Sequence, residues 1–135
     1  SGEKMIDYII YNTSSGEILK VIRVLSEDLA SANTPSGYSY LEGTADISTQ
    51  KISSGSIVSK SSSEEAAFNN EVLSRDAERK RNNLLLNSDY LQTVDFNAKL
   101  SDSDRTNWQN YRQALRDVPA QAGYPSNITW PTKPT

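Results

Sequence analysis

The sequence contains no cysteine and no histidine among its 135 residues. Without cysteine there can be no disulfide, no thiolate metal site and no thiol nucleophile. Without histidine the chain lacks the side chain best suited to move protons near neutral pH, which is also the commonest metal ligand. Catalysis would therefore need carboxylates, a lysine or an oxygen-ligated metal, and we predict no cofactor.

The chain also lacks a basic excess and a long apolar run. It has 14 Lys and Arg against 17 Asp and Glu, a formal net charge of −3 and a pI near 4.9. A surface that tracks phosphates normally carries a clear basic excess, so we expect no nucleic-acid partner. No apolar run approaches the roughly 20 residues that span a bilayer, and the N-terminus lacks a secretory pattern. We expect a soluble, unprocessed protein without membrane insertion.

Residues 1–61 are predicted to form a small antiparallel β domain. The segments "MIDYIIYN" and "EILKVIRVL" are rich in β-branched and aromatic residues, and "TSSG" between them supplies Gly16 for a hairpin turn. "SEDLASANTPSG" is expected to be a turn-rich connection to a third strand, "YSYLEG". "TQKISSGSIVSK" predicts a fourth and a fifth strand around Gly55.

Both strands of the predicted hairpin are apolar on both faces. In the first strand Tyr8 and Ile10 alternate with Ile9 and Tyr11. A half-exposed hairpin would place polar residues on one face. The pattern therefore predicts cover on both sides, or a sheet edge that another chain buries.

Residues 62–135 are predicted to form a helical module with two helices, at about 63–86 and 102–117, and an extended proline-rich tail, 119–135. Ser62 or Ser63 can cap the first helix, and Ser101 can cap the second. Pro119 ends the second helix, and the tail needs a groove in which to lie, with Tyr124, Ile128 and Trp130 as anchors. The predicted fold class is therefore α+β.

The stretch 75–81 of the first helix, "RDAERKR", could be a basic patch for nucleic acid. Its acidic residues favour a solvated helix face instead. Glu71 and Arg75, and likewise Asp76 and Lys80, stand four residues apart and can form surface pairs.

Two chemical sites were weighed against structural roles. Asp102, Asp104 and Thr106 have the first ligand spacings of a calcium loop, but the later positions do not fit, and helix capping explains the same residues. A hydrolase could use a carboxylate pair drawn from three aspartates, although no spacing shows that they converge. We favour the alternative that these aspartates cap turns or pair with Arg112 or Arg116. The three are Asp89, Asp95 and Asp117.

The C-terminal half, from about residue 75 to 134, resembles the tailed-bacteriophage tail assembly chaperone family. Its pattern is Arg, two residues, Leu-Leu, then Ser-Asp and an aromatic, then Trp-x-x-Tyr-Arg-x-x-Leu-Arg-Asp, and finally Trp-Pro. Tyr90 stands where the family more often has tryptophan. The matching positions are Arg81, Leu84, Leu85, Ser88, Asp89, Tyr90, Asp95, Trp108, Tyr111, Arg112, Gln113, Ala114, Leu115, Arg116, Asp117, Trp130 and Pro131. The N-terminal half is similar in style to phage tail-fibre assembly proteins.

This resemblance implies a non-enzymatic protein that acts in tail or tail-fibre assembly and attachment. The expected partner is a tail-fibre, baseplate or other tail protein, and a homo-oligomer is possible. We expect the protein in the host cytoplasm during assembly and then in the tail of the virion, as a retained structural component. The alternatives are a transient chaperone that is absent from the mature particle and a small carboxylate-dependent hydrolase.

Overall fold

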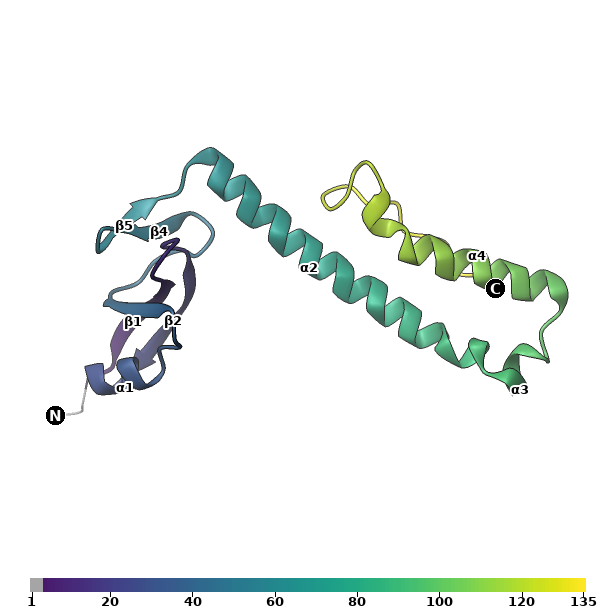
Figure 1. Cartoon of the computed structure of the whole chain (residues 1–135), viewed down its shortest axis with the longest axis horizontal. Helices are drawn as coiled ribbons and strands as arrows, with labels where there is room; N and C mark the ends of the chain where they lie inside the picture. Colours follow the sequence, from purple (N-terminus) through teal and green to yellow (C-terminus); the bar gives the residue numbers. More distant parts are fainter. Residues whose placement is uncertain (1–3) are drawn as a thin grey trace. The chain divides into compact units, whose positions relative to one another are not determined.

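The computed structural model describes residues 4–135, which divide into two compact units (Figure 1). The first unit ends at Phe68, and the second begins at Asn69. Antiparallel strands and a short helix form the first unit, and helices with an irregular C-terminal tail form the second. Helix α2 (Ser62–Ser88) begins in the first unit and continues in the second. The predicted α+β fold class is confirmed.

Five strands in two sheets make up the β-structure of the described residues, and all five were predicted. Strands β1 (Ile6–Asn12), β2 (Ile18–Val24) and β3 (Tyr38–Glu42) form an antiparallel sheet in the order β2-β1-β3. Strands β4 (Gln50–Ser53) and β5 (Ser56–Ser59) form a separate antiparallel pair. Both hairpin turns use glycine with positive φ, 77° at Gly16 and 76° at Gly55.

The turn-rich connection expected between β2 and β3 also contains the helix α1 (Glu27–Ala32), which was not predicted. The Oγ of Ser26 accepts a hydrogen bond of 3.4 Å from the Leu29 amide, and Glu27 and Asp28 occupy the first turn. Acidic side chains in that position favour a helix start. A helix of only six residues is too short to show a 3.6-residue period in the sequence.

The chain itself covers both faces of the central strand β1. On one face lie Tyr8 and the fully buried Ile10, beside Tyr40 of β3, whose hydroxyl donates to Glu27 of α1 at 3.1 Å. On the other face Ile9, fully buried, packs with Ile18 and Ile52 in a core that β4 helps to form. For β1 the predicted cover on both sides is thus supplied within the first unit. In the segment of the second strand Leu19 and Leu25 remain 46% exposed, so the expected cover is incomplete there.

The second unit pairs the end of α2 with the helix α4 (Asp102–Arg116), which runs back beside it (Figure 1). Between them lie two short helices that the sequence did not indicate, η1 (Asp89–Gln92) and α3 (Val94–Asn97). After α4 comes the single-turn helix η2 (Val118–Ala120), which contains Pro119, and residues 128–135 have no regular structure. The buried apolar residues of this unit are Ala77, Leu91, Tyr111, Leu115 and Val118.

The cap of α4 is the predicted one, since Ser101 Oγ accepts from the Asp104 amide at 3.1 Å. The predicted cap of α2 at Ser62 or Ser63 was wrong, because Ser61 fills this role. Its Oγ accepts from the Glu64 amide at 3.2 Å, and its own amide donates to the Glu64 carboxylate at 3.0 Å. This reciprocal pair is a capping box, which requires the serine to stand three residues before the glutamate.

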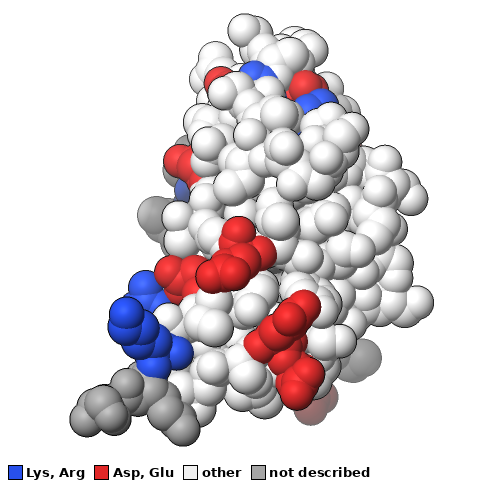
Figure 2. Space-filling view, turned by 90° about the vertical axis from the view of Figure 1, so that its left-hand side faces the viewer, with Lys and Arg blue, Asp and Glu red and all other residues white. Residues whose placement is uncertain are grey.

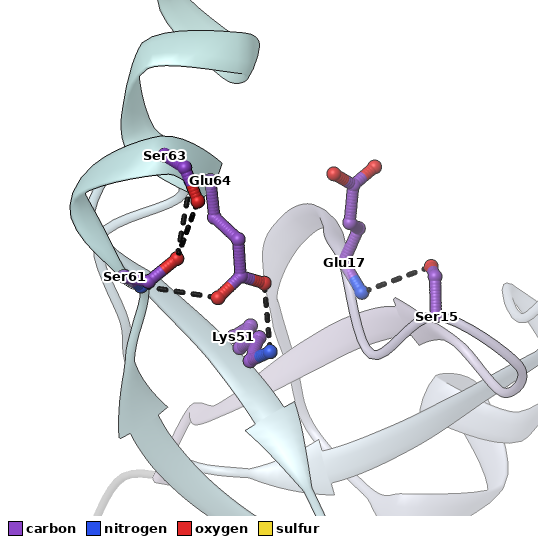
Figure 3. A network of polar contacts seen from close by, with 6 residues as sticks. All are labelled: Ser15, Glu17, Lys51, Ser61, Ser63 and Glu64. Carbon is purple, nitrogen blue, oxygen red and sulfur yellow. Dashed lines mark hydrogen bonds and ion pairs between the residues drawn. The ribbon is translucent and has the colours of Figure 1, made fainter.

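The Glu64 carboxylate also joins α2 to the small sheet of the first unit. Figure 3 shows Lys51 of β4 and Ser61 pointing toward it, and Lys51 Nζ lies 2.7 Å from Glu64 Oε2. The hydrogen bond from Lys51 is the largest cause that lowers the pKa of Glu64 to about 2, followed by the hydrogen bonds from Ser61. These contacts favour the charged form in the folded protein.

Acid is therefore expected to destabilise the first unit partly through Glu64. Because folding depresses its pKa from 4.5 to about 2, the stabilisation is complete above pH 4.5 and is lost as the pH falls toward 2. Glu64→Gln keeps an acceptor for the cap but removes the charge. In urea unfolding followed by circular dichroism, the wild-type midpoint should fall more steeply between pH 4.5 and 2.5 than that of Glu64→Gln. Equal pH profiles, with Glu65→Gln as control, would contradict this role.

Candidate docking site

Arg112 of α4 holds the C-terminal end of α2. Its Nη1 donates to the Leu85 carbonyl oxygen at 2.9 Å and to Ser88 Oγ at 2.5 Å, and its Nη2 lies 2.8 Å from Asp89 Oδ1. The Arg112 side chain is only 13% exposed. The guanidinium thus shares the Leu85 carbonyl oxygen with Ser88, which also donates to it at 2.9 Å, and pairs with a carboxylate at the same helix end, which fixes how the two helices meet.

An aromatic stripe on α4 lies on the side of the helix that packs in the unit. Trp108 and Tyr111 contact edge to face, with ring centroids 5.7 Å apart. Tyr111 is buried, Leu115 is fully buried, and Trp108 is half-buried. Three or four residues separate successive members, so they share one face. The predicted stripe is a packing surface of the helix.

The C-terminal tail lies on both helices of the second unit. Lys80 of α2 places its ammonium 4.3 Å from the ring centre of Trp130, and Lys133 lies 6.0 Å from the ring centre of Trp108. Tyr124 donates from its hydroxyl to the Ser74 carbonyl oxygen at 3.4 Å. Pro131, next to Trp130, is partly buried. The groove that the tail needs is therefore the surface of α2 and α4.

One of the two predicted surface pairs on α2 is present and the other is wrong. Glu71 and Arg75 pair at 3.3 Å as predicted. Asp76 pairs instead with Arg79, at 3.6 Å, because Lys80 turns to the Trp130 ring. Trp130, which Lys80 contacts, lies 50 residues further along the chain, so the spacing of residues within α2 could not predict this contact.

The remaining candidate residues have local partners or none. Arg81 donates to the Asn82 side chain, and Leu84 is half-buried. Arg116 binds Gln113 in place of the carboxylate that we expected, and Gln113 donates to Asp117 at 3.0 Å.

The three aspartates weighed for hydrolysis do not share a partner. Asp89 pairs with Arg112, Asp117 accepts from Gln113, and Asp95 forms no ion pair with any residue of 4–135. Asp102 of the weighed calcium loop pairs with Arg105 at 2.7 Å. Within the described residues no group of acidic side chains has the arrangement of a metal site. These contacts support the structural interpretation of the carboxylates.

Residues 74–135 match the family model described as phage tail assembly chaperone protein. This C-terminal part of the chain belongs to the phage tail assembly chaperone family. No curated protein and no solved structure matched the chain in the other two comparisons. The chaperone module covers α2 from Ser74, the two short helices, α4 and the tail, so the Arg112 contacts and the aromatic stripe all lie within it.

The chaperone module also carries a group of exposed apolar side chains, of which the sequence analysis named only Tyr90. We call Leu86, Tyr90, Val94 and Phe96 the apolar corner, because they lie where the chain turns from α2 to α4. Their exposed fractions are 66%, 51%, 85% and 39%. The members lie at the end of α2 and in the two short helices η1 and α3, so their spacing follows no single period that a test of periodicity could detect. In the described part of the chain, no helix is both long and apolar enough to span a membrane.

Proposed function

We propose that this chain is a non-enzymatic protein of phage tail construction that docks to a tail-fibre, baseplate or other tail protein and stays in the virion as a structural component. The observation that carries the proposal is the family match over residues 74–135. A chaperone of tail assembly acts by binding tail proteins, so a docking surface is the feature that such a module needs.

The arrangement of the module supports docking in preference to catalysis. Arg112 and Ser88, which are largely buried, satisfy each other, as expected of groups that fix a shape. The large apolar side chains of the apolar corner are exposed to solvent, as expected of side chains that bind another protein. The module therefore combines a fixed frame with an uncovered apolar surface.

The charges give no support to the nucleic-acid alternative. On α2, Glu71 and Asp76 neutralise Arg75 and Arg79. Figure 2 shows a different face, on the side of the β-strands, which is mostly uncharged, with acidic side chains near its centre, basic ones at the lower left and a few of both signs near the top. Phosphate binding needs a continuous basic stripe.

Mass spectrometry of purified phage particles tests the proposal. If the chain is a retained component, its peptides will be present in fixed proportion to those of known tail proteins, and washing with high salt will not remove them. If it is a transient chaperone, its peptides will be absent from particles but will co-purify with a tail protein from infected cells. Absence from both samples would refute a role in tail construction.

A further inference from the structure

The apolar corner leaves four large apolar side chains exposed to water. Val94 is 85% exposed, and Leu86 is 66% exposed. Tyr90 and Phe96 contact edge to face at 4.9 Å, so their rings form one continuous apolar surface across η1 and α3. Removing large apolar side chains from water is favourable, so a partner that covers the corner would be stabilised by this contact.

A carboxylate belongs to the same short helix as two members of the apolar corner. Asp95 lies between Val94 and Phe96 in α3 and is exposed. It forms no ion pair with any residue between 4 and 135, although Lys99 follows four residues later. The neighbouring Asp89 is already neutralised by Arg112. A partner that covers the corner must therefore meet one negative charge that the module leaves without a counterion.

This charge discriminates between the possible occupants. A second copy that met the corner through a two-fold axis passing near Asp95 would bring this carboxylate close to its own equivalent, and like charges repel. An anionic membrane surface would repel it in the same way. A segment that carries a Lys or Arg among apolar side chains would cover the rings and pair with the carboxylate at once.

We propose that the apolar corner binds a segment of another phage tail protein that presents apolar side chains together with a Lys or Arg opposite Asp95. This inference rests on the proposed function and identifies the chemistry of the partner segment. Val94, Tyr90 and Phe96 supply the apolar contact area, and Asp95 fixes the register of the segment.

Site-specific cross-linking can locate the contact. A photo-reactive phenylalanine replaces Val94 in the full chain during phage assembly, and a matched variant carries it at Leu73, an exposed apolar position on α2. We expect position 94, and not position 73, to cross-link to a tail protein, at a segment containing apolar residues and a Lys or Arg. Cross-links to a second copy, to lipid or to an acidic segment would overturn the inference.

Charge reversal then tests the role of Asp95. A synthetic peptide with the cross-linked sequence should bind the full chain, and Asp95→Lys should weaken this binding by about tenfold or more. A peptide with its Lys or Arg replaced by Glu should restore binding to the Asp95→Lys variant but not to the wild type. Leu73→Asp should change the affinity by less than about twofold, since that position lies outside the corner.

Failure of this inference differs from failure of the proposed function. If the chain is present in particles or tail complexes but position 94 does not cross-link, the corner is not the docking surface, and the role in tail construction stands. If Asp95→Lys binds the peptide as tightly as the wild type, the charge pairing is wrong. If the chain is absent from particles and complexes alike, the role in tail construction itself fails.

Discussion

Replacing Arg112 by alanine is expected to lower the free energy of unfolding of the second unit by about 2–3 kcal/mol. The change removes two hydrogen bonds and an ion pair that join α4 to the end of α2. Ser88, which is only 3% exposed, would lose the donor of its 2.5 Å hydrogen bond. The Ser88 hydroxyl would keep its 2.9 Å hydrogen bond to the Leu85 carbonyl oxygen, but its buried lone pairs would lose their donor, which makes the loss larger than that of a surface pair.

Arg116→Ala is the matched control for this prediction, since it removes the same side chain from the same helix one turn later. Arg116 is exposed and binds only the Gln113 side chain, so its loss should cost no more than about 0.5 kcal/mol. Trp108 and Trp130 are the two tryptophans of the chain, and both belong to the second unit. Urea unfolding followed by tryptophan fluorescence therefore reports this unit alone. Equal midpoints for the two variants would show that Arg112 does not hold the helices together.

The sequence predicted the regular elements because their signals are local. The alternating apolar residues of β1 and β2 and the Ser101 cap of α4 need only neighbouring residues to be recognised. The short helix α1 was not predicted, because six residues are too few to show a helical period in the sequence. The cap of α2 was misplaced because three consecutive serines precede Glu64, and only the spacing of the capping box separates Ser61 from the other two.

The candidate site was predictable only in part, because its contacts join distant segments. The sequence suggested an aspartate partner for Arg112, and the structure selects Asp89, but nothing in the sequence indicated Ser88 as a third partner. The contact between Lys80 and Trp130 depends on where the tail returns to α2. Tertiary packing decides such contacts, whereas composition and spacing describe only the residues available to make them.

Gly16→Ala, which adds a single methyl group, is expected to lower the free energy of unfolding of the first unit substantially. Gly16 lies at the turn between β1 and β2 with φ of 77°, a conformation that costs other residues about 1–2 kcal/mol. A Cβ atom there would also overlap the carbonyl oxygen of Ile52. The Gly16 carbonyl accepts a 2.9 Å hydrogen bond from the Ile52 amide, so this turn is where the hairpin meets β4. Overpacking adds about 1–3 kcal/mol, giving a combined loss of about 2–5 kcal/mol.

Gly37→Ala separates the two causes. Gly37 has a similar φ of 84°, but a Cβ atom there would have no neighbour within 4 Å, so only the conformational cost remains. Amide hydrogen exchange of β1 and β4 should therefore accelerate much more in Gly16→Ala than in Gly37→Ala, while tryptophan fluorescence of the second unit remains unchanged in both. Equal acceleration in the two variants would mean that backbone conformation alone matters. A larger acceleration in Gly16→Ala would instead show that the close contact between Gly16 and Ile52 holds the two sheets together, since both variants share the conformational cost of a positive φ.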